Sequence, residues 1–219
     1  MKKILAVIMA LALVICCFAA CGGNTTTDDT TAAPENDDTT AAATDADAVV
    51  KIGVFEPASG DSGAGGKKET LGMQYANAQT PTVEIGGKTY KVELVYADNG
   101  SDQSKAPAAA AELVGKEVAI VLGSYGSGVS IAASETFKNA GLAALGVTCT
   151  NPNVTAGNEH YFRICFLDPF QGTVLANFAT SKFEAKKAYC LGELGNEYDQ
   201  GLINFFSEAF KAAGGEVIA

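Results

Sequence analysis

The chain has 219 residues, of which 47% are hydrophobic, and its formal net charge at pH 7 is −10. That length and composition suit one domain of about 150 residues with its own buried core and additional segments at the front. From Val49 onward 18 acidic and 13 basic residues remain, a net charge near −5. A nucleic-acid-binding surface needs a basic face, so this charge argues against nucleic acid as a partner.

Residues 1–20 have the pattern of a signal peptide, with two early lysines, an apolar run and then small residues. Ala19 and Ala20 precede Cys21, and this junction resembles the lipobox of bacterial lipoproteins, although Phe18 stands where an aliphatic residue is usual. The resemblance implies that Cys21 is lipidated and tethers an exported protein to the membrane, on its extracellular or periplasmic face. Ordinary secretory cleavage is the alternative.

Residues 21–48 read as a linker behind the lipidated cysteine. The stretch is rich in Thr, Asp and Ala, carries seven acidic residues and no basic ones, and has no large apolar side chain to bury. We therefore expect it to be disordered.

Three of the six cysteines, Cys149, Cys165 and Cys190, lie in the part expected to fold. The sequence has no CxxC pair and a single histidine, His160. A zinc site of the usual composition is therefore not expected, and neither a metal nor another cofactor is predicted.

Apolar strands and helical segments alternate from Val49 onward. The predicted strands are 49–55, 90–97, 118–123, 142–147, 161–167 and 188–194, and the predicted helices are 67–78, 104–114, 127–140, 171–183 and 201–213. The strands are continuous apolar runs, as expected when helices cover both faces of a sheet. This pattern predicts an α/β fold with parallel sheets.

The chain ends in "GGEVIA", where a further strand is predicted to begin. We expect that strand to be unpaired and the chain to be truncated at its C-terminus.

The loop "GSYGSG" follows an apolar strand and precedes a helix. In parallel sheets such loops hold ligands, because helix N-termini favour negative charge. Ser127 can donate from its hydroxyl and amide, and glycines such as Gly126 let a ligand approach the backbone. The loop lacks the lysine of a P-loop and the glycine order of a dinucleotide fingerprint, so a small carboxylate fits best. The alternative is that Ser127 is only a helix N-cap.

The next strand is followed by "GVTCTNPNVT", which again offers hydroxyls and open backbone at a turn. Thr150 can donate to a carboxylate, and the Thr148 carbonyl can accept from an ammonium group. Together the two loops complement a zwitterion.

Six ordered segments carry a wider resemblance: "VVKIGVFEPASG", "ELVYADNGSD", "IVLGSYGSGVSIAAS", "TNPNVT", "YFRICFLDPFQGTVLANFA" and "EYDQGL". From Val49 to its end the chain resembles the substrate-binding lipoproteins of branched-chain amino-acid ABC transporters, the leucine/isoleucine/valine-binding family with a type I periplasmic binding fold. The resemblance implies two α/β lobes, a first over 49–167 and an incomplete second over 168–219. It also implies a non-enzymatic protein that captures an amino acid and delivers it to a membrane permease.

The resemblance also assigns residues. Ser127 falls on the position that binds the ligand carboxylate, and Thr150 on the position that bridges the carboxylate and the ammonium group. Thr148 falls on a carbonyl contact, and Tyr198 on an aromatic residue of the second lobe. For Tyr198 a surface tyrosine in a loop is the alternative. The acidic residue that pairs with the ammonium group in the family falls beyond the end of the chain.

The first loop departs from the family pattern, since Gly65 stands where a tyrosine is frequent and a wall of the pocket is missing. Tyr125 and Phe170 are candidate apolar walls, each with core or surface packing as the alternative. Glu56, at the end of the first strand, is a further polar candidate whose alternative is a solvated loop acid.

Two other functions remain open. A lipoprotein of the same fold that senses a ligand without feeding a transporter is one. An exported hydrolase with Ser127 as nucleophile and His160 as base is the other, although Ser127 is not in a GxSxG elbow.

Overall fold

The computed structural model describes residues 48–218. The predicted signal peptide, the predicted lipidation site Cys21 and nearly all of the predicted linker lie outside these residues.

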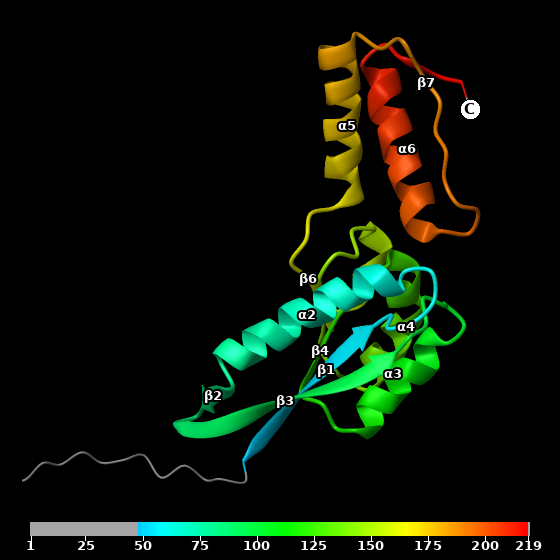
Figure 1. The fold of residues 1–219 in the computed structure, drawn as a ribbon. Helices are drawn as coiled ribbons and strands as arrows, with labels where there is room; N and C mark the ends of the chain where they lie inside the picture. The colour runs from blue at the N-terminus through cyan, green and yellow to red at the C-terminus, as the bar shows by residue number, and fades with distance from the viewer. Residues whose placement is uncertain (1–47, 219) are drawn as a thin grey trace, which may run out of the picture. The chain divides into compact units, whose positions relative to one another are not determined.

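A six-stranded sheet of order β2-β3-β1-β4-β5-β6 forms the centre of the fold (Figure 1). Its strands are β1 (Val49–Glu56), β2 (Thr82–Ile85), β3 (Lys88–Asp98), β4 (Ile120–Leu122), β5 (Ala144–Gly146) and β6 (Tyr161–Arg163). All neighbouring pairs are parallel except β2 with β3. The α/β fold predicted from the alternation of elements is confirmed.

The edge strand β2 was not predicted, and its antiparallel pairing corrects the expectation of a purely parallel sheet. It is joined to β3 by Gly86 and Gly87, which both have positive φ angles (61° and 79°). Two such residues form the tight turn that the twist of a hairpin requires. The Gly-Gly pair between "TVEI" and "KTY" was the signal for this hairpin.

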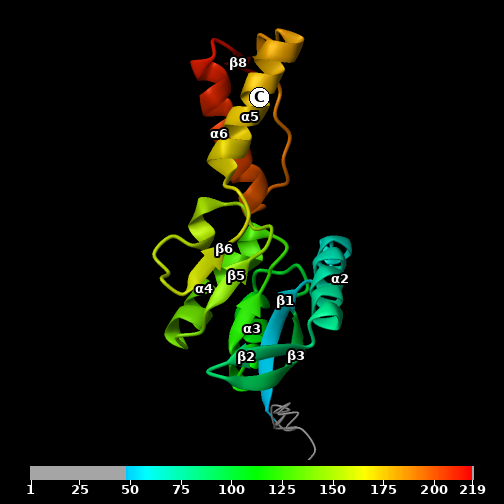
Figure 2. The ribbon, with the colours of Figure 1, turned by 90° about the vertical axis from the view of Figure 1, so that its left-hand side faces the viewer.

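Helices cover both faces of the sheet, as predicted. The helix α2 (Gly63–Gln79) packs on β1 and β3 from one side. On the other side α3 (Ala106–Gly115) and α4 (Ser127–Asn139) pack against each other and against the sheet (Figure 2). Pro107 is tolerated because it lies in the first turn of α3.

The buried core lies between the sheet and the α3–α4 layer. Phe137 of α4 is fully buried and its ring meets the rings of Phe55 and Tyr161 edge-on, with centroids 5.5 and 6.2 Å away. Such edge-to-face pairs stabilise beyond the area they bury. This cluster joins β1, in the interior of the sheet, and β6, at its edge, to one helix.

After β6 the chain forms α5 (Asp168–Phe183) and α6 (Glu197–Ala212), which pack against each other. Two short strands, β7 (Lys187–Ala188) and β8 (Glu216–Val217), pair in parallel. The C-terminal strand was therefore wrongly predicted to be unpaired. The predicted strand 188–194 is also wrong beyond Ala188, since residues 189–194 form no regular strand.

Within residues 48–218 no helix has both the length and the apolar character needed to span a membrane. The same residues contain no cluster of His, Cys, Asp and Glu side chains that could hold a metal ion. Cys149, Cys165 and Cys190 are unpaired thiols.

We predict that Phe137→Ala lowers the free energy of unfolding by about 3–5 kcal/mol, because it leaves a cavity between β1, β6 and α4. Urea denaturation measures the change. Phe183→Ala is the control, since Phe183 is 70% exposed, and it should cost no more than about 1 kcal/mol. Equal losses for the two variants would contradict the assignment of the core.

Candidate functional site

A pocket of about 470 Å³ lies where the loops that follow β4 and β5 meet the start of α6. Six of its lining residues are those predicted from the sequence to contact a ligand: Tyr125, Gly126, Ser127, Thr148, Thr150 and Tyr198. The other lining residues are Ser62, Cys165, Phe166, Gln171, Asn196 and Asp199. Residues distant in sequence thus gather at the carboxyl edge of the sheet, where α/β folds bind ligands.

Ser127 is the first residue of α4 and is buried, with 2% of its surface exposed. The N-cap position belongs to Gly126, and no side chain caps the helix, so the alternative reading of Ser127 as an N-cap is wrong. The Ser127 hydroxyl oxygen accepts from the Asn151 N–H at 3.3 Å. Because a hydroxyl carries one hydrogen of its own, Ser127 can still donate it to a ligand.

Thr150 is also buried, with 5% of its surface exposed, and its Oγ1 has no hydrogen-bond partner among residues 48–218. Its neighbour is Asp168, whose N–H donates to the Thr150 carbonyl at 3.1 Å. Burial raises the pKa of the Asp168 carboxyl; the Thr150 hydroxyl opposes that rise but lies outside hydrogen-bond geometry. An unpartnered buried hydroxyl is costly, so a ligand that bonds it gains affinity.

Arg163 holds the loop that carries Thr150. Its guanidinium donates to the carbonyls of Cys149 and Asn151 at 2.9 and 3.0 Å, on either side of Thr150. The Asn151 side chain in turn donates to the Glu197 carbonyl at 2.8 Å, which connects this loop to the first turn of α6. Sequence reasoning missed these roles, because neither Arg163 nor Asn151 contacts the pocket through a recognisable motif.

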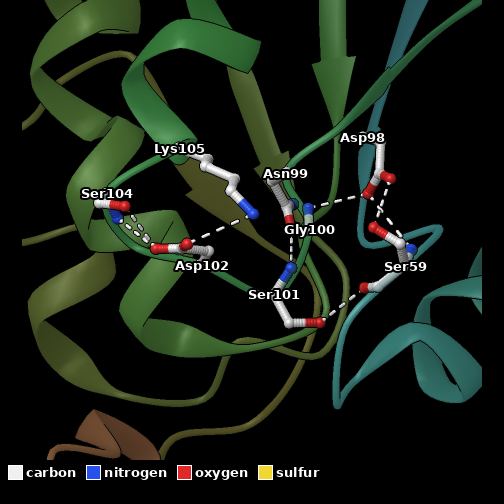
Figure 3. A network of polar contacts seen from close by, with 8 residues as sticks. All are labelled: Ser59, Asp98, Asn99, Gly100, Ser101, Asp102, Ser104 and Lys105. Atoms are coloured by element: carbon white, nitrogen blue, oxygen red, sulfur yellow. Dashed lines mark hydrogen bonds and ion pairs between the residues drawn. The ribbon is translucent and has the colours of Figure 1, made fainter.

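The glycine loop is supported by the segment that follows β3. Asn99 is fully buried and its Nδ2 donates to the Ser124 hydroxyl at 2.8 Å. Figure 3 shows the network around it, in which the Asp98 carboxylate accepts from Gly100 and Ser59, and Ser101 donates to the Ser59 carbonyl. Although partial burial opposes the effect, these hydrogen bonds lower the pKa of Asp98. The loops after β1, β3 and β4 are thereby held together.

Tyr125 occupies the space that Gly65 leaves open. A Cβ placed on Gly65 would lie 2.6–2.7 Å from the Tyr125 ring. Gly65, predicted in the first loop, lies in the first turn of α2, and the ring of Tyr125 from the loop after β4 fills the space beside it. Tyr125 is 40% exposed and lines the pocket rather than the core.

Tyr198 lies in the first turn of α6 and is half-buried, so it is not an exposed loop residue. Its hydroxyl accepts from Gln171 Nε2 at 3.0 Å. Phe170, the other predicted wall, is 63% exposed and does not line the pocket. Its neighbour Phe166, which sequence reasoning passed over, lines the pocket instead and packs against Phe170.

Glu56 is not the solvated loop acid considered as its alternative, since only 3% of it is exposed. Its carboxyl oxygen accepts from the Tyr125 N–H at 2.7 Å. His160 lies just before β6, at the opposite edge of the sheet from Ser127, so the geometry does not pair them as nucleophile and base.

A mostly parallel α/β sheet with two hydroxyl donors and aromatic walls at its carboxyl edge is the arrangement in which α/β folds bind small ligands. Residues 49–219 match the family model described as periplasmic binding protein, and the chain belongs to that family.

Relatives and solved structures agree with this assignment. The chain is 31% identical to Leu/Ile/Val-binding protein homolog 3 of Brucella melitensis, over 78% of this chain and 45% of that protein. It is 35% identical to an amino acid binding protein of Pseudomonas aeruginosa, over 73% of this chain and 43% of that protein. The chain thus spans about half the length of these relatives.

Among solved structures, the leucine binding protein LivK of Thermotoga maritima superposes with a TM-score of 0.73 at 36% identity, over 77% of this chain and 47% of that one. LivJ of Streptococcus pneumoniae, solved in complex with isoleucine, gives a TM-score of 0.69 at 30% identity, over 78% of this chain and 48% of that one.

We predict that Gly65→Ala moves the Tyr125 ring. Alanine in place of a helical glycine normally raises the free energy of unfolding by about 0.5–1 kcal/mol. In the parent chain the new methyl group must displace the ring, so the gain should be lost; in a Tyr125→Ala background it should return. Urea denaturation of the parent, the two single variants and the double variant gives the coupling free energy between positions 65 and 125.

The matched control is Gly72→Ala in the same helix, where an added Cβ meets nothing within 4 Å. It should stabilise both backgrounds equally. If Gly65→Ala behaves in the same way as Gly72→Ala, the packing of Tyr125 on Gly65 is wrong.

Proposed function

We propose that this protein captures an amino acid of the branched-chain type outside the cytoplasm and delivers it to the permease of an ABC transporter. The names of its relatives support the ligand class, since they are Leu/Ile/Val-binding and leucine-binding proteins, and LivJ was solved with isoleucine. Binding without catalysis is part of the proposal, because His160 is remote from Ser127.

One observation carries the proposal: Ser127 and Thr150 both present unused hydroxyl hydrogens to the same pocket. Two converging donors at a helix N-terminus complement a carboxylate. The carbonyl of Thr148 then accepts from the ligand ammonium group. Tyr125 and Tyr198 supply aromatic walls for an apolar side chain.

The ligand-binding half of the proposal is tested with Thr150→Val and L-leucine. Valine keeps the shape and removes only the hydroxyl, which has no partner within residues 48–218. The affinity should fall by about 10- to 100-fold, as expected for a hydrogen bond to a charged group. The free energy of unfolding should stay the same or rise, because no protein hydrogen bond is lost.

Calorimetric titration and urea denaturation of the full chain measure the two quantities. Ser127→Ala should weaken leucine binding by a similar factor, whereas Ser181→Ala, at an exposed position of α5, should leave it unchanged. Parental affinity in both Ser127→Ala and Thr150→Val would refute the site. Loss of leucine uptake on deletion of the gene distinguishes delivery to a transporter from sensing.

We also propose that the protein is exported and anchored through a lipid on Cys21, with the segment 21–48 as a spacer. Cys21→Ser should release the protein from the membrane fraction, because the thioether to the lipid cannot form. Cys17→Ser, four residues earlier in the apolar run, is the matched control and should remain anchored. Radiolabelled palmitate incorporation measures both, and labelling that survives in Cys21→Ser would contradict the anchor.

A further inference from the structure

The carboxyls of Glu56, which is buried, and Glu69, which is half-buried, form a pair that the proposed binding site does not use directly. Glu56 ends β1 and Glu69 lies on α2, and the two carboxyls lie within reach of each other. Glu56 Oε1 and Glu69 Oε2 are both buried, and neither oxygen has a hydrogen-bond partner among residues 48–218. Two carboxyl oxygens make a hydrogen bond only when one carries a proton.

The outer oxygens of the pair reach the two ligand loops. Glu56 Oε2 accepts from the Tyr125 N–H at 2.7 Å, in the loop after β4. Glu69 Oε1 accepts from the Thr148 hydroxyl, in the loop after β5. One proton between the two inner oxygens would complete a single chain of hydrogen bonds from Tyr125 through both carboxyls to Thr148.

We propose that Glu56 and Glu69 share one proton and act as positioning residues, holding the Tyr125 and Thr148 loops in the register that binds the ligand. Loss of that proton places two negative charges side by side in a buried site, and their repulsion separates the loops. Ligand affinity is then linked to the protonation of the pair. The inference rests on the proposed function for the ligand and on the described geometry for the pair.

The surroundings favour the protonated form. Burial first, and then the hydrogen bond and the charge of Glu69, raise the pKa of Glu56 to about 9, against the opposing bond from Tyr125. Tyr161 on β6 also faces Glu56, and burial raises the pKa of its hydroxyl, which keeps it neutral. Asp98, the register partner of Glu56 on β3, is bonded instead to Ser59, Ala58 and Gly100.

The sign of the pH dependence follows from the raised pKa. The folded protein keeps a proton that the unfolded chain releases near the ordinary glutamate value, so the stabilising contribution is complete at acidic pH and falls as the pH rises towards about 9. Ligand affinity depends only on the folded protein and should fall near pH 9.

Glu56→Gln tests the pair, because an amide reproduces the protonated carboxyl at every pH: its oxygen accepts from Tyr125 and its nitrogen donates to Glu69. In the parent chain, ¹³C NMR should show the Glu56 carboxyl titrating near pH 9, and the Tyr125 amide shift should follow with the same midpoint. In Glu56→Gln the chemical shift of the Tyr125 amide should no longer change near pH 9. Glu135→Gln, at an exposed position of α4, should behave as the parent.

Leucine binding is then compared between the parent and Glu56→Gln at each pH, which cancels the titration of the amino acid itself. The ratio of dissociation constants, parent over variant, should be near one at neutral pH and rise to about tenfold above pH 9, equivalent to one pKa unit of coupling. Should Glu56→Gln fail to fold, Glu69→Gln serves instead, and the Glu56 titration should move to lower pH.

A Glu56 carboxyl that titrates near the ordinary glutamate value, with no effect on Tyr125, would overturn the shared proton. A titration near pH 9 with a constant ratio of affinities would overturn the link to the ligand. Absence of leucine binding by the parent at neutral pH would instead count against the proposed function, and the NMR titration of Glu56 and Tyr125 would still decide whether the pair holds the loop.

Discussion

The close approach of the glycine loop to the end of β1 is the contact on which the site depends. A Cβ on Gly123 would lie 2.2 Å from the Phe55 carbonyl oxygen and 2.6 Å from Glu56 Oε1, and its φ of 118° is unfavourable for other residues. Only glycine lets the chain leave β4 across the end of β1 at this distance. The same crossing brings the Tyr125 N–H to Glu56 and starts α4 at Ser127. Parallel pairing of β4 with β5 then places Thr150 beside it.

Hydrogen bonding divides the polar side chains of this edge into two groups. Asn99, Arg163 and Asn151 are fully engaged in holding loops, through bonds to a hydroxyl or to backbone carbonyls. Ser127 and Thr150 keep hydroxyl hydrogens that no described residue accepts. Leaving a buried hydroxyl without a partner costs about 1–3 kcal/mol, and the ligand recovers this cost when it binds. Rigid supports beside unsatisfied donors are what a preorganised carboxylate site requires.

Sequence patterns predicted the sheet and the pocket because both follow from local rules. Continuous apolar runs predict buried parallel strands, and loops that follow them meet at one edge. The β2 hairpin was missed since its strand is only four residues long and exposed. The burial of Glu56 was also missed, because it depends on Glu69, a residue that α2 brings back over the end of β1. The filling of the Gly65 gap by Tyr125 is likewise a tertiary contact, between α2 and the loop after β4, that no local pattern reports.

Tyr125 is the residue at which these separate constraints meet. Its N–H is held by the bond to Glu56, and its ring packs against Gly65, where a side chain would leave no room for it. The ring is therefore positioned by β1 and α2, while the opposite wall, Tyr198, is positioned by α6 and Gln171. In the proposed complex, a ligand side chain between the two rings would meet one wall set by the six-stranded sheet and one set by the helical pair. Its fit depends on both, and the bond from Asn151 to Glu197 connects them directly at the site.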